Sequence, residues 1–332
     1  MKMKAVLWTR YGPPEVLQLS EVEKPAPRDN EVLIRIHATT VATGDTEIRR
    51  LDVAAWLWPL ARLGFGVLRP RKRIMGQELA GEIESTGKDV KKFKTGDQVF
   101  ARAGFGLGTY AEYTCLPEGG LIALKPSNMT YEEAAAVPLG GLEALHFIRE
   151  ANIKKGQRAL INGAGGSIGT FAVQIAKAFG AEVIGVDSTT KMDMLRSIGA
   201  DRVVDYTKQD FTRSGETYDV IFDVIGKASF SDCIGLLNDN GTYLSANPRL
   251  ADRVRGSRAS RRGGKRVVFG SAREEPGDLI YLKELIEAGK VRTVIDRRFP
   301  LEKIPEAHQY VETAHKMGNV VITLGCRESD LC

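Results

Sequence analysis

Residues 162–169 read Asn-Gly-Ala-Gly-Gly-Ser-Ile-Gly and connect two segments that have different hydrophobic patterns. Before them, the apolar run Arg158–Asn162 predicts a strand. After them, apolar residues recur on one helical face, at Ile168, Phe171, Ala172, Ile175, Ala176 and Phe179. Gly180 is placed to end that helix. A strand, a glycine-rich turn and a helix in this order favour a phosphate-binding turn over a purely structural glycine loop.

Each key position of this turn has its own physical requirement. Aligned to the pattern Gly-x-Gly-x-x-Gly, the three positions are Ala164, Gly166 and Gly169. Ala164 can make the tight turn, Gly166 lets the backbone approach a pyrophosphate, and Gly169 lets helix and strand pack closely. The backbone N–H groups of Ser167 and Ile168, at the start of the helix, carry a partial positive charge that suits a diphosphate.

Asp187 ends the next predicted strand, Glu182–Asp187, 18 positions after Gly169. A carboxylate at this place usually bonds the ribose hydroxyls of the adenosine and repels a 2′-phosphate, which favours NAD. Ser188, Lys191 and Tyr206 instead offer hydroxyl groups and a positive charge that can hold a 2′-phosphate. A solvated lysine at a helix start is an equal alternative for Lys191, so both cofactors remain open.

From residue 126 onward, predicted helices and strands alternate. Thr130 and Glu133 form a capping box that starts a helix running through Val137. Further helices are predicted at 191–198 and 228–237, and further strands at 218–223 and 241–245. The tail adds helices at 278–288 and 305–316 and a last strand at 319–324. This alternation is typical of a parallel, doubly wound sheet.

The first 125 residues have a different pattern. Short apolar runs, separated by Gly, Pro, Asp and Asn, occur at residues 5–8, 32–36, 81–83, 98–100 and 110–113. Such runs predict an antiparallel, partly barrel-like unit. A chain of 332 residues with 43% apolar content is long enough for two domains. The predicted fold class is therefore α/β, a β-rich barrel domain followed by a doubly wound parallel sheet.

Composition and charge exclude several classes of protein. The four cysteines show neither disulfide nor metal spacing, and no apolar segment reaches the 20 or so residues of a membrane span. No signal peptide is recognised, so we expect a cytoplasmic protein. Within the net charge of +5, residues 249–266 hold seven Arg and one Lys against one Asp, which leaves −2 for the rest. This local excess predicts a solvated loop, with counter-charge for phosphate or substrate as a second alternative and RNA binding as a third.

Motifs along almost the whole chain resemble the medium-chain dehydrogenase/reductase superfamily, in its zinc-free, zeta-crystallin-type quinone oxidoreductase branch. Around the glycine-rich turn they are Gly156-Gln157, Leu160, Ala164-Gly165-Gly166, Gly169, Gln174 and Lys177. Ser167 departs from the branch's second glycine. Elsewhere they are Gly76-Gln77-Glu78-Leu79-Ala80-Gly81, which resembles Gly-His-Glu-x-x-Gly, then Gly96-Asp97, Gly199-Ala200-Asp201 and residues 318–322.

The resemblance implies a GroES-like domain of residues 1–125 and 271–332 and a Rossmann NAD(P)-binding domain of residues 126–270. It implies a cleft whose floor holds the nicotinamide, near Ile225, Gly226 and Asn247. It also implies NAD(P)H, with NADPH commoner and NADH possible, because Asp187 departs from the small residue frequent in this branch. A homodimer is common in the branch, and a sheet edge is a natural place for one to form.

The resemblance also bears on metal and catalysis. Zinc-dependent relatives hold zinc with Cys, His and Cys, and the matching positions are Ala42, Gln77 and Leu139, which predicts no metal site. Without a Lewis acid, the favoured reaction is direct hydride transfer, without flavin, from nicotinamide to a quinone or an activated alkene. Candidates to orient this apolar acceptor or relay a proton are Thr43, Asp45 and Gln77. Alternatives are a structural hydrogen bond for Asp45 and a cleft-lining amide for Gln77.

Two questions stay open at this level. One alternative function is an alcohol or aldehyde dehydrogenase, and another is a nucleotide-binding protein without turnover. The apolar segment 53–68, followed by Arg69-Pro70-Arg71-Lys72-Arg73, predicts a packed helix, a hydrophobic lid over the acceptor, or a membrane-surface contact. For the protein as a whole, we expect neither stable membrane insertion nor a nucleic-acid partner.

Overall fold

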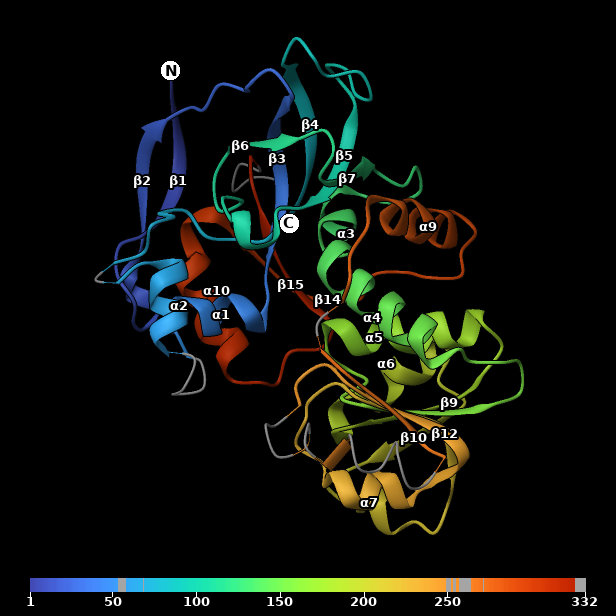
Figure 1. Ribbon diagram of the computed structural model, residues 1–332. Coiled ribbons are helices and arrows are strands. Elements are labelled where there is room, and N and C mark those ends of the chain that lie inside the picture. Colours follow the sequence, from blue (N-terminus) through green and yellow to red (C-terminus); the bar gives the residue numbers. More distant parts are fainter. Residues whose placement is uncertain are drawn as a thin grey trace. The chain divides into compact units, whose positions relative to one another are not determined.

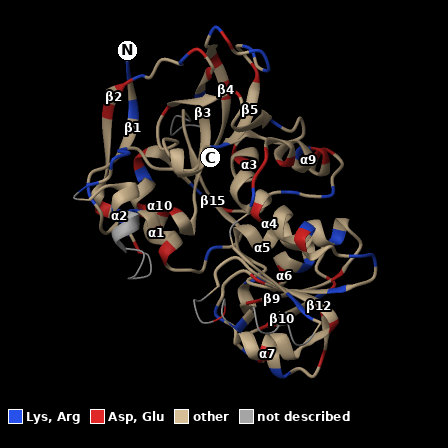
Figure 2. Ribbon diagram, viewed as in Figure 1, with Lys and Arg blue, Asp and Glu red and all other residues tan. Residues whose placement is uncertain are grey.

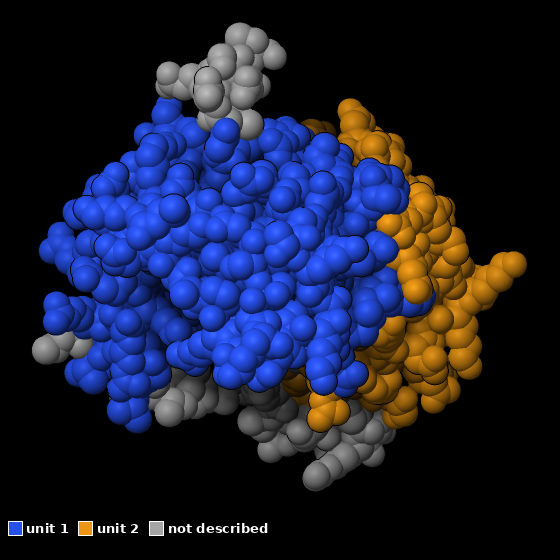
Figure 3. Space-filling model, turned by 90° about the horizontal axis from the view of Figure 1, so that it is seen from above, with its two compact units in different colours: residues 1–139, 275–283, 295–332 blue, residues 140–274, 284–294 orange. Residues whose placement is uncertain are grey.

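The computed structural model describes residues 1–52, 58–67, 69–248, 252, 255–256, 264–270 and 272–325 (Figure 1). They form two compact units, coloured separately in Figure 3. Unit 1 comprises residues 1–139, 275–283 and 295–332, and unit 2 comprises residues 140–274 and 284–294. The predicted domain limits, 1–125 with 271–332 and 126–270, stay a prediction. The two units are described separately.

Unit 1 is built around a seven-stranded sheet. Its path runs β14 (Ile295–Pro300), β15 (Asn319–Thr323), β3 (Glu31–Val41), β4 (Glu78–Thr86), β5 (Gln98–Arg102) and β7 (Leu121–Leu124), and β6 (Tyr113–Pro117) pairs with β3. All pairs are antiparallel except β14 with β15. A separate antiparallel pair joins β1 (Lys2–Trp8) to β2 (Leu17–Glu23). The β-rich, mainly antiparallel character predicted for the first 125 residues is confirmed.

Among the described residues, four α-helices lie within unit 1: α1 (Thr43–Arg50), α2 (Trp58–Phe65), α3 (Tyr131–Ala135) and α10 (Ile304–Glu312). Two more cross the limit between units, α4 (Pro138–Ala151) and α9 (Pro276–Glu287). At α3 the predicted capping box forms: the Thr130 hydroxyl accepts from Glu133 N–H at 3.2 Å, and the Glu133 carboxylate accepts from Thr130 N–H at 2.9 Å. Helices α1 and α4 were not predicted. The first has no capping side chain at Ala42, and the second begins with Pro-Leu-Gly-Gly, a poor helix-forming segment.

Unit 2 contains a six-stranded sheet in which every pair is parallel. Its order is β10 (Arg202–Asp205), β9 (Glu182–Asp187), β8 (Arg158–Asn162), β11 (Tyr218–Asp223), β12 (Leu237–Ser245) and β13 (Arg266–Phe269). Helices α5 (Ser167–Ala178) and α7 (Phe230–Gly235) lie on opposite faces of it (Figure 1), and α6 (Met192–Ser197) connects β9 to β10. The chain therefore reverses direction across the sheet between β8 and β11, where ligands bind in doubly wound folds.

The bounds of β8, β9 and β11 match the prediction, whereas other elements differ. The predicted strand 110–113 is wrong, because Ala111 makes only an isolated bridge to Ala5 and β6 begins at Tyr113. The helix predicted at 305–316 ends at Glu312, and Ala314 then adopts a left-handed conformation with φ +60°. The helix predicted at 191–198 is preceded by a 3₁₀ turn, Thr189–Lys191.

Lys and Arg residues are interspersed with Asp and Glu residues along the ribbon of the described residues (Figure 2). Of the basic run 249–266, only 252, 255–256 and 264–266 are among those residues. Of the apolar segment 53–68, residues 53–57 and 68 lie outside them, so neither the lid nor the surface contact is decided. Within the described part of the chain, no helix is long and apolar enough to cross a membrane.

Candidate functional site

The glycine-rich turn of unit 2 is held tightly between β8 and α5. The N–H groups of Gly163 and Ala164 donate to the Val186 carbonyl oxygen at 3.0 and 3.1 Å, which fastens the turn to β9. A side chain at Gly169 would place its Cβ 2.1 Å from the Gly163 carbonyl oxygen. Helix and turn therefore approach as closely as the pattern predicts, and only glycine fits at this position.

Gly166 is the N-cap residue of α5, and its surroundings are open. A Cβ at Gly166 would find no atom closer than the Gly163 carbonyl oxygen, 3.7 Å away. Its φ of −88° is ordinary, and no side chain caps this end of the helix. The first turn of a helix leaves N–H groups without intrahelical partners. Open space in front of such a terminus fits a diphosphate.

The structure brings the predicted nicotinamide-binding loops to this turn. Ile225 follows β11, and a Cβ at Gly163 would lie 2.5 Å from the Cγ1 of Ile225. Gly226 has φ +70°, and a Cβ there would lie 2.2 Å from the carbonyl oxygen of Asn247. The Asn247 side chain in turn donates to the Val224 carbonyl oxygen at 3.1 Å. The loops after β8, β11 and β12 thus form one cluster at the carboxyl ends of these strands.

Asp187 and Lys191 form a buried ion pair beside the turn. Lys191 Nζ lies 3.1 Å from Asp187 Oδ1, and both side chains are less than a tenth exposed. The same carboxylate accepts the N–H of Gly165 and the N–H of Ser188, each at 2.8 Å. Lys191 is therefore not solvated, and that alternative is wrong. Tyr206 is half exposed, and its N–H donates to the Asp187 carbonyl oxygen at 3.2 Å.

Polar side chains that were not predicted end the two central strands. Asn162 ends β8 and donates from Nδ2 to Asp223 Oδ1 at 2.9 Å, and Asp223 ends β11. Tyr243 of β12 donates to the other carboxylate oxygen at 3.2 Å. Burial raises the pKa of Asp223. The signal for Asn162 and Asp223 was present in the sequence, because each closes an otherwise apolar run.

Two of the three candidate catalytic residues meet in unit 1, and the third does not. Gln77 Nε2 donates to Asp45 Oδ1 at 3.1 Å, and both side chains are buried. Asp45 Oδ2 accepts the N–H of Ala42 at 2.9 Å, so the local structural hydrogen bond considered for Asp45 is present. Thr43, the first residue of α1, is exposed.

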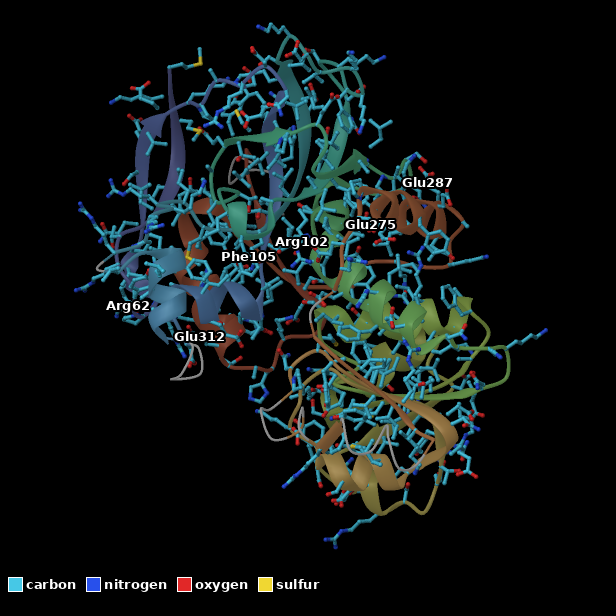
Figure 4. The ribbon with its side chains drawn as sticks, in the orientation of Figure 1. Arg62, Arg102, Phe105, Glu275, Glu287 and Glu312 are labelled. Atoms are coloured by element: carbon cyan, nitrogen blue, oxygen red, sulfur yellow. The ribbon has the colours of Figure 1, made fainter. Side chains whose placement is uncertain are left out.

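Burial dominates the ionisation of Asp45. It raises the pKa of the carboxyl group from 3.8 to about 6, against the opposing hydrogen bonds from Ala42 N–H, Gln77 and the Tyr110 hydroxyl. The guanidinium of Arg102, at the end of β5 (Figure 4), also lowers it. A carboxyl group with a pKa in this range can change its charge near neutral pH.

Glu78 is a second buried carboxyl group in unit 1 that sequence reasoning missed. Its Oε1 accepts from the Thr40 hydroxyl, and its Oε2 accepts from the N–H of Leu139 at 2.7 Å. Burial raises its pKa to about 7. Its position directly after Gln77 in Gly76-Gln77-Glu78 was the available signal.

The three positions that match zinc ligands in relatives lie in one region. Glu78 directly follows Gln77 and accepts a hydrogen bond from the backbone N–H of Leu139. Asp45 accepts both from Gln77 and from the backbone N–H of Ala42, and so links these two residues. Alanine and leucine side chains carry no atom that ligates zinc, so this donor set does not fit a catalytic zinc ion. Within the described residues, no three His, Cys, Asp or Glu side chains gather as ligands elsewhere.

Comparisons with known proteins agree with this architecture. Residues 28–126 match the family model described as alcohol dehydrogenase GroES-like domain, and residues 198–322 match zinc-binding dehydrogenase. A 2-methylene-furan-3-one reductase from Solanum lycopersicum is 32% identical, over 97% of this chain and 79% of that protein. An Arabidopsis thaliana protein, NADPH-dependent alkenal/one oxidoreductase, chloroplastic, is 31% identical over the same shares. The solved quinone oxidoreductase from Coxiella burnetii has a TM-score of 0.87 and 29% identity, and 98% of this chain and 100% of that chain are covered.

A GroES-like unit joined to a parallel sheet with a glycine-rich turn defines the class of two-domain, dinucleotide-dependent oxidoreductases. Within that class, the chain belongs to the medium-chain dehydrogenase/reductase superfamily, in its quinone oxidoreductase branch. The predicted fold class, a GroES-like domain with a Rossmann sheet, is confirmed.

Proposed function

We propose that the protein is an NAD(P)H-dependent oxidoreductase that transfers a hydride to a quinone or to an activated alkene such as an enone or enal. When bound, the reduced nicotinamide supplies the hydride from C4, and one proton completes the reduction. The observation that carries the proposal is the uncapped start of α5 at Gly166, with open space in front of it and the Asp187–Lys191 pair beside it. Relatives named alkenal/one oxidoreductase and quinone oxidoreductase support it.

Unit 1 supplies the residues that handle the acceptor in this proposal. Gln77 presents an amide that is anchored to Asp45 and is 5% exposed. A donor at this position stabilises the negative charge that develops on the acceptor's oxygen during hydride addition. The absence of ligating atoms at Ala42 and Leu139 favours an acceptor that is already electrophilic over an alcohol, which needs a metal to form its alkoxide.

NADPH is the cofactor that we propose. A free Asp187 carboxylate would repel a 2′-phosphate, but here its charge is compensated by Lys191 at 3.1 Å and by two backbone N–H groups. The hydroxyls of Ser188 and Thr190 lie 3.4 Å apart beside this pair, and the ring of Tyr206 is half exposed nearby. These groups match what a 2′-phosphate needs, namely a cation and hydroxyl donors.

Replacement of Gly166 by valine tests the proposal at its carrying observation. The ordinary φ and the open surroundings of Gly166 allow a side chain, so the fold should be retained. The added methyl groups then occupy the space in front of the helix terminus, and NADPH affinity should fall about tenfold or more. Isothermal titration with NADPH measures this, and Gly235→Ala in α7, where a Cβ meets nothing within 4 Å, is the matched control. Unchanged affinity in a folded Gly166→Val protein would refute the binding mode.

A panel of acceptors separates the proposed reaction from its alternatives. Quinones, enones and enals are mixed with NADPH or NADH, and oxidation is followed at the nicotinamide absorbance. Primary and secondary alcohols with NADP⁺ or NAD⁺ form the opposing arm. We expect turnover in the first arm only. Turnover of alcohols would favour a dehydrogenase, and nucleotide binding without turnover in either arm would favour a binding protein.

The expected oligomeric state, binding partners and cellular location are proposals as well. We propose that the protein is a cytoplasmic homodimer whose two copies pair through an edge of the unit 2 sheet. It takes an apolar acceptor and does not bind nucleic acid. In the described part of that sheet, the two edge strands are β10 and β13. An edge strand offers unpaired N–H and C=O groups to a second copy. Sedimentation equilibrium measures the mass and decides between monomer and dimer.

A further inference from the structure

A row of four buried side chains starts at the proposed acceptor-binding amide of unit 1. Gln77 Nε2 donates to Asp45 at 3.1 Å. Asp45 is also hydrogen-bonded to the Tyr110 hydroxyl, which lies 3.1 Å from His308 Nε2. Gln77 is 5% exposed, Asp45 is 1% exposed, and Tyr110 and His308 are fully buried. The reaction proposed above uses only the first two of these residues.

The backbone holds Tyr110 firmly beside Gln77. The N–H of Tyr110 donates to the Met75 carbonyl oxygen at 3.0 Å, and its carbonyl oxygen accepts from Val6 at 2.8 Å. Gly76 directly precedes Gln77 and has φ +90°, and a Cβ there would lie 2.5 Å from the Tyr110 ring. Glycine at this position therefore makes room for the ring. His308 reaches the hydroxyl from α10, with its ring edge-on to that of Tyr110 at 5.7 Å.

The protons of the row can be assigned by counting donors. The Tyr110 hydroxyl has one proton, for Asp45 or for His308. If it went to His308, the ring would carry its own proton on Nδ1, which is buried and has no hydrogen-bond partner among the described residues. If it goes to Asp45, His308 donates from Nε2 to the tyrosine oxygen, and Nδ1 keeps only a lone pair. The second arrangement leaves no buried N–H unsatisfied and therefore costs less.

This direction fixes the orientation of Gln77. Asp45 accepts from Ala42 N–H, from Tyr110 and from Gln77, which suits an ionised carboxylate. One N–H of Gln77 Nε2 is used on Asp45, and the second remains for a ligand. A protonated Asp45 would instead donate to Gln77 Oε1, and the amide would turn over.

We propose that His308 and Tyr110 are positioning residues for the reduction, and that they act through Asp45 to hold the second N–H of Gln77 toward the oxygen of the acceptor. This inference rests on the proposed function. Burial lowers the pKa of His308 well below its usual value, so the ring stays neutral and keeps its single donor. The other charged groups near the row are Arg49, Glu78 and Arg102.

Three variants test the positioning role kinetically. Tyr110→Phe and His308→Leu each remove a donor from the row, whereas His308→Gln retains an N–H that can reach the tyrosine oxygen. We expect kcat to fall about tenfold in the first two, with KM for NADPH unchanged, and His308→Gln to restore most of the loss. Loss of the tyrosine donor raises the pKa of Asp45, so the acid limb of the kcat/KM profile should move to higher pH. Unchanged pH profiles would assign a merely structural role and overturn the inference.

A second measurement does not depend on turnover. The side-chain ¹⁵N signal of Gln77, assigned by its loss in Gln77→Ala, is followed as a function of pH in the Glu78→Gln background, which removes the neighbouring carboxyl group. We expect its titration midpoint to rise in Tyr110→Phe and His308→Leu and to return in His308→Gln. Equal midpoints in all variants would overturn the inference. If the midpoints shift as expected but the protein reduces no acceptor, the proposed function is rejected. The coupling of Gln77 to His308 is then still supported.

Discussion

In the Asp187–Lys191 pair, the lysine changes the cofactor preference that the aspartate alone would indicate. Asp187 alone favours NAD, because its charge repels a 2′-phosphate. Lys191 lies 3.1 Å away and is itself buried, so the pair has no net charge. A cofactor preference inferred from the carboxylate alone would miss this compensation.

Replacing Lys191 by methionine should therefore weaken NADPH more than NADH. The variant removes the cation and leaves Asp187 uncompensated, and a charge-assisted hydrogen bond contributes about 1.5–3 kcal/mol, or roughly 10- to 150-fold in Kd. Titration of both cofactors measures the change in their ratio. Lys177→Met is the matched control, because Lys177 also pairs with an aspartate, Asp201, on the same unit. Equal losses for the two cofactors would contradict the role given to Lys191.

Asp45 should make the stability of the protein depend on pH. Its pKa is raised in the folded state, from 3.8 to about 6, because it is buried. Such a group contributes stability that is fully present below pH 4 and is lost as the pH rises through about 6. The shift corresponds to roughly 3 kcal/mol between these limits. Asp45→Asn lacks this titration.

The measurement is the free energy of unfolding in urea at pH 5 and at pH 8, for the parent protein and for Asp45→Asn. The parent should lose stability relative to the variant between the two pH values. Glu78, whose pKa is raised to about 7, remains in both proteins and cancels to first order. A difference between the proteins that does not change with pH would show that Asp45 does not titrate in this window.

At the scale of elements, the short helix α3 depends on its cap. Five residues, Tyr131–Ala135, are too few for a helix to be stable by propensity alone. The capping box satisfies two backbone N–H groups at the start of the helix. The N–H of Glu133 donates to the Thr130 hydroxyl at 3.2 Å, and the N–H of Thr130 donates to the Glu133 carboxylate at 2.9 Å. Ala134 and Ala135 then bury fully against the sheet of unit 1.

Thr130→Ala should destabilise unit 1 by about 1 kcal/mol, because the N–H of Glu133 loses its acceptor. Urea unfolding followed by circular dichroism gives the value. Thr130→Ser keeps the hydroxyl and should lose much less. Equal losses in the two variants would show that the methyl group, rather than the cap, carries the effect.

At the scale of the whole molecule, the proposed chemistry is divided between the two units. Unit 2 carries the dinucleotide turn. Unit 1 carries the buried Gln77 amide, and the carboxyl groups of Asp45 and Glu78 bond the positions that match zinc ligands in relatives. Figure 4 labels Glu312 of α10, which pairs with Arg49 and Arg50 of α1 and so ties the helix of His308 to the helix of Asp45. We propose that a hydrogen-bonded network in unit 1 takes the place of a metal centre.

Removal of metal should leave the enzyme intact. Dialysis against a strong chelator is expected to change neither the NADPH-dependent rate nor the Tm, because Ala42 and Leu139 provide no ligand. Elemental analysis before dialysis should find zinc well below one equivalent. Loss of activity on dialysis, with recovery when zinc is added, would contradict this prediction.

The parts of the fold that were predicted correctly depend on local sequence. The limits of β8, β9 and β11 and the turn at residues 162–169 follow from hydrophobic periodicity and from glycine geometry. Helix α1 was missed because it has no capping side chain and contains Gly44. Strand β2 was missed because its outer residues are polar and its apolar face is narrow.

The residues of the candidate site also fall into those that local sequence indicated and those that it did not. The Gly166 turn, Asp187 and the loops of Ile225 and Asn247 were found from the sequence, and the structure gathers them in unit 2. Glu78, Tyr110 and His308 were not found, since their partners lie far away along the chain. Glu78 bonds Leu139, and Tyr110 bonds His308 across 198 positions.

By itself, the sequence determined the parallel sheet, its dinucleotide turn and the lack of zinc-ligating side chains at Ala42 and Leu139, because periodicity, glycine placement and side-chain chemistry are local properties. Only the tertiary structure decided which charges are compensated and which carboxyl groups are buried. Burial depends on the exclusion of water by packing between residues that are remote in sequence, which no short segment specifies. Even the Asp187–Lys191 pair, only four positions apart, needed the structure, which shows that both side chains are buried and in contact.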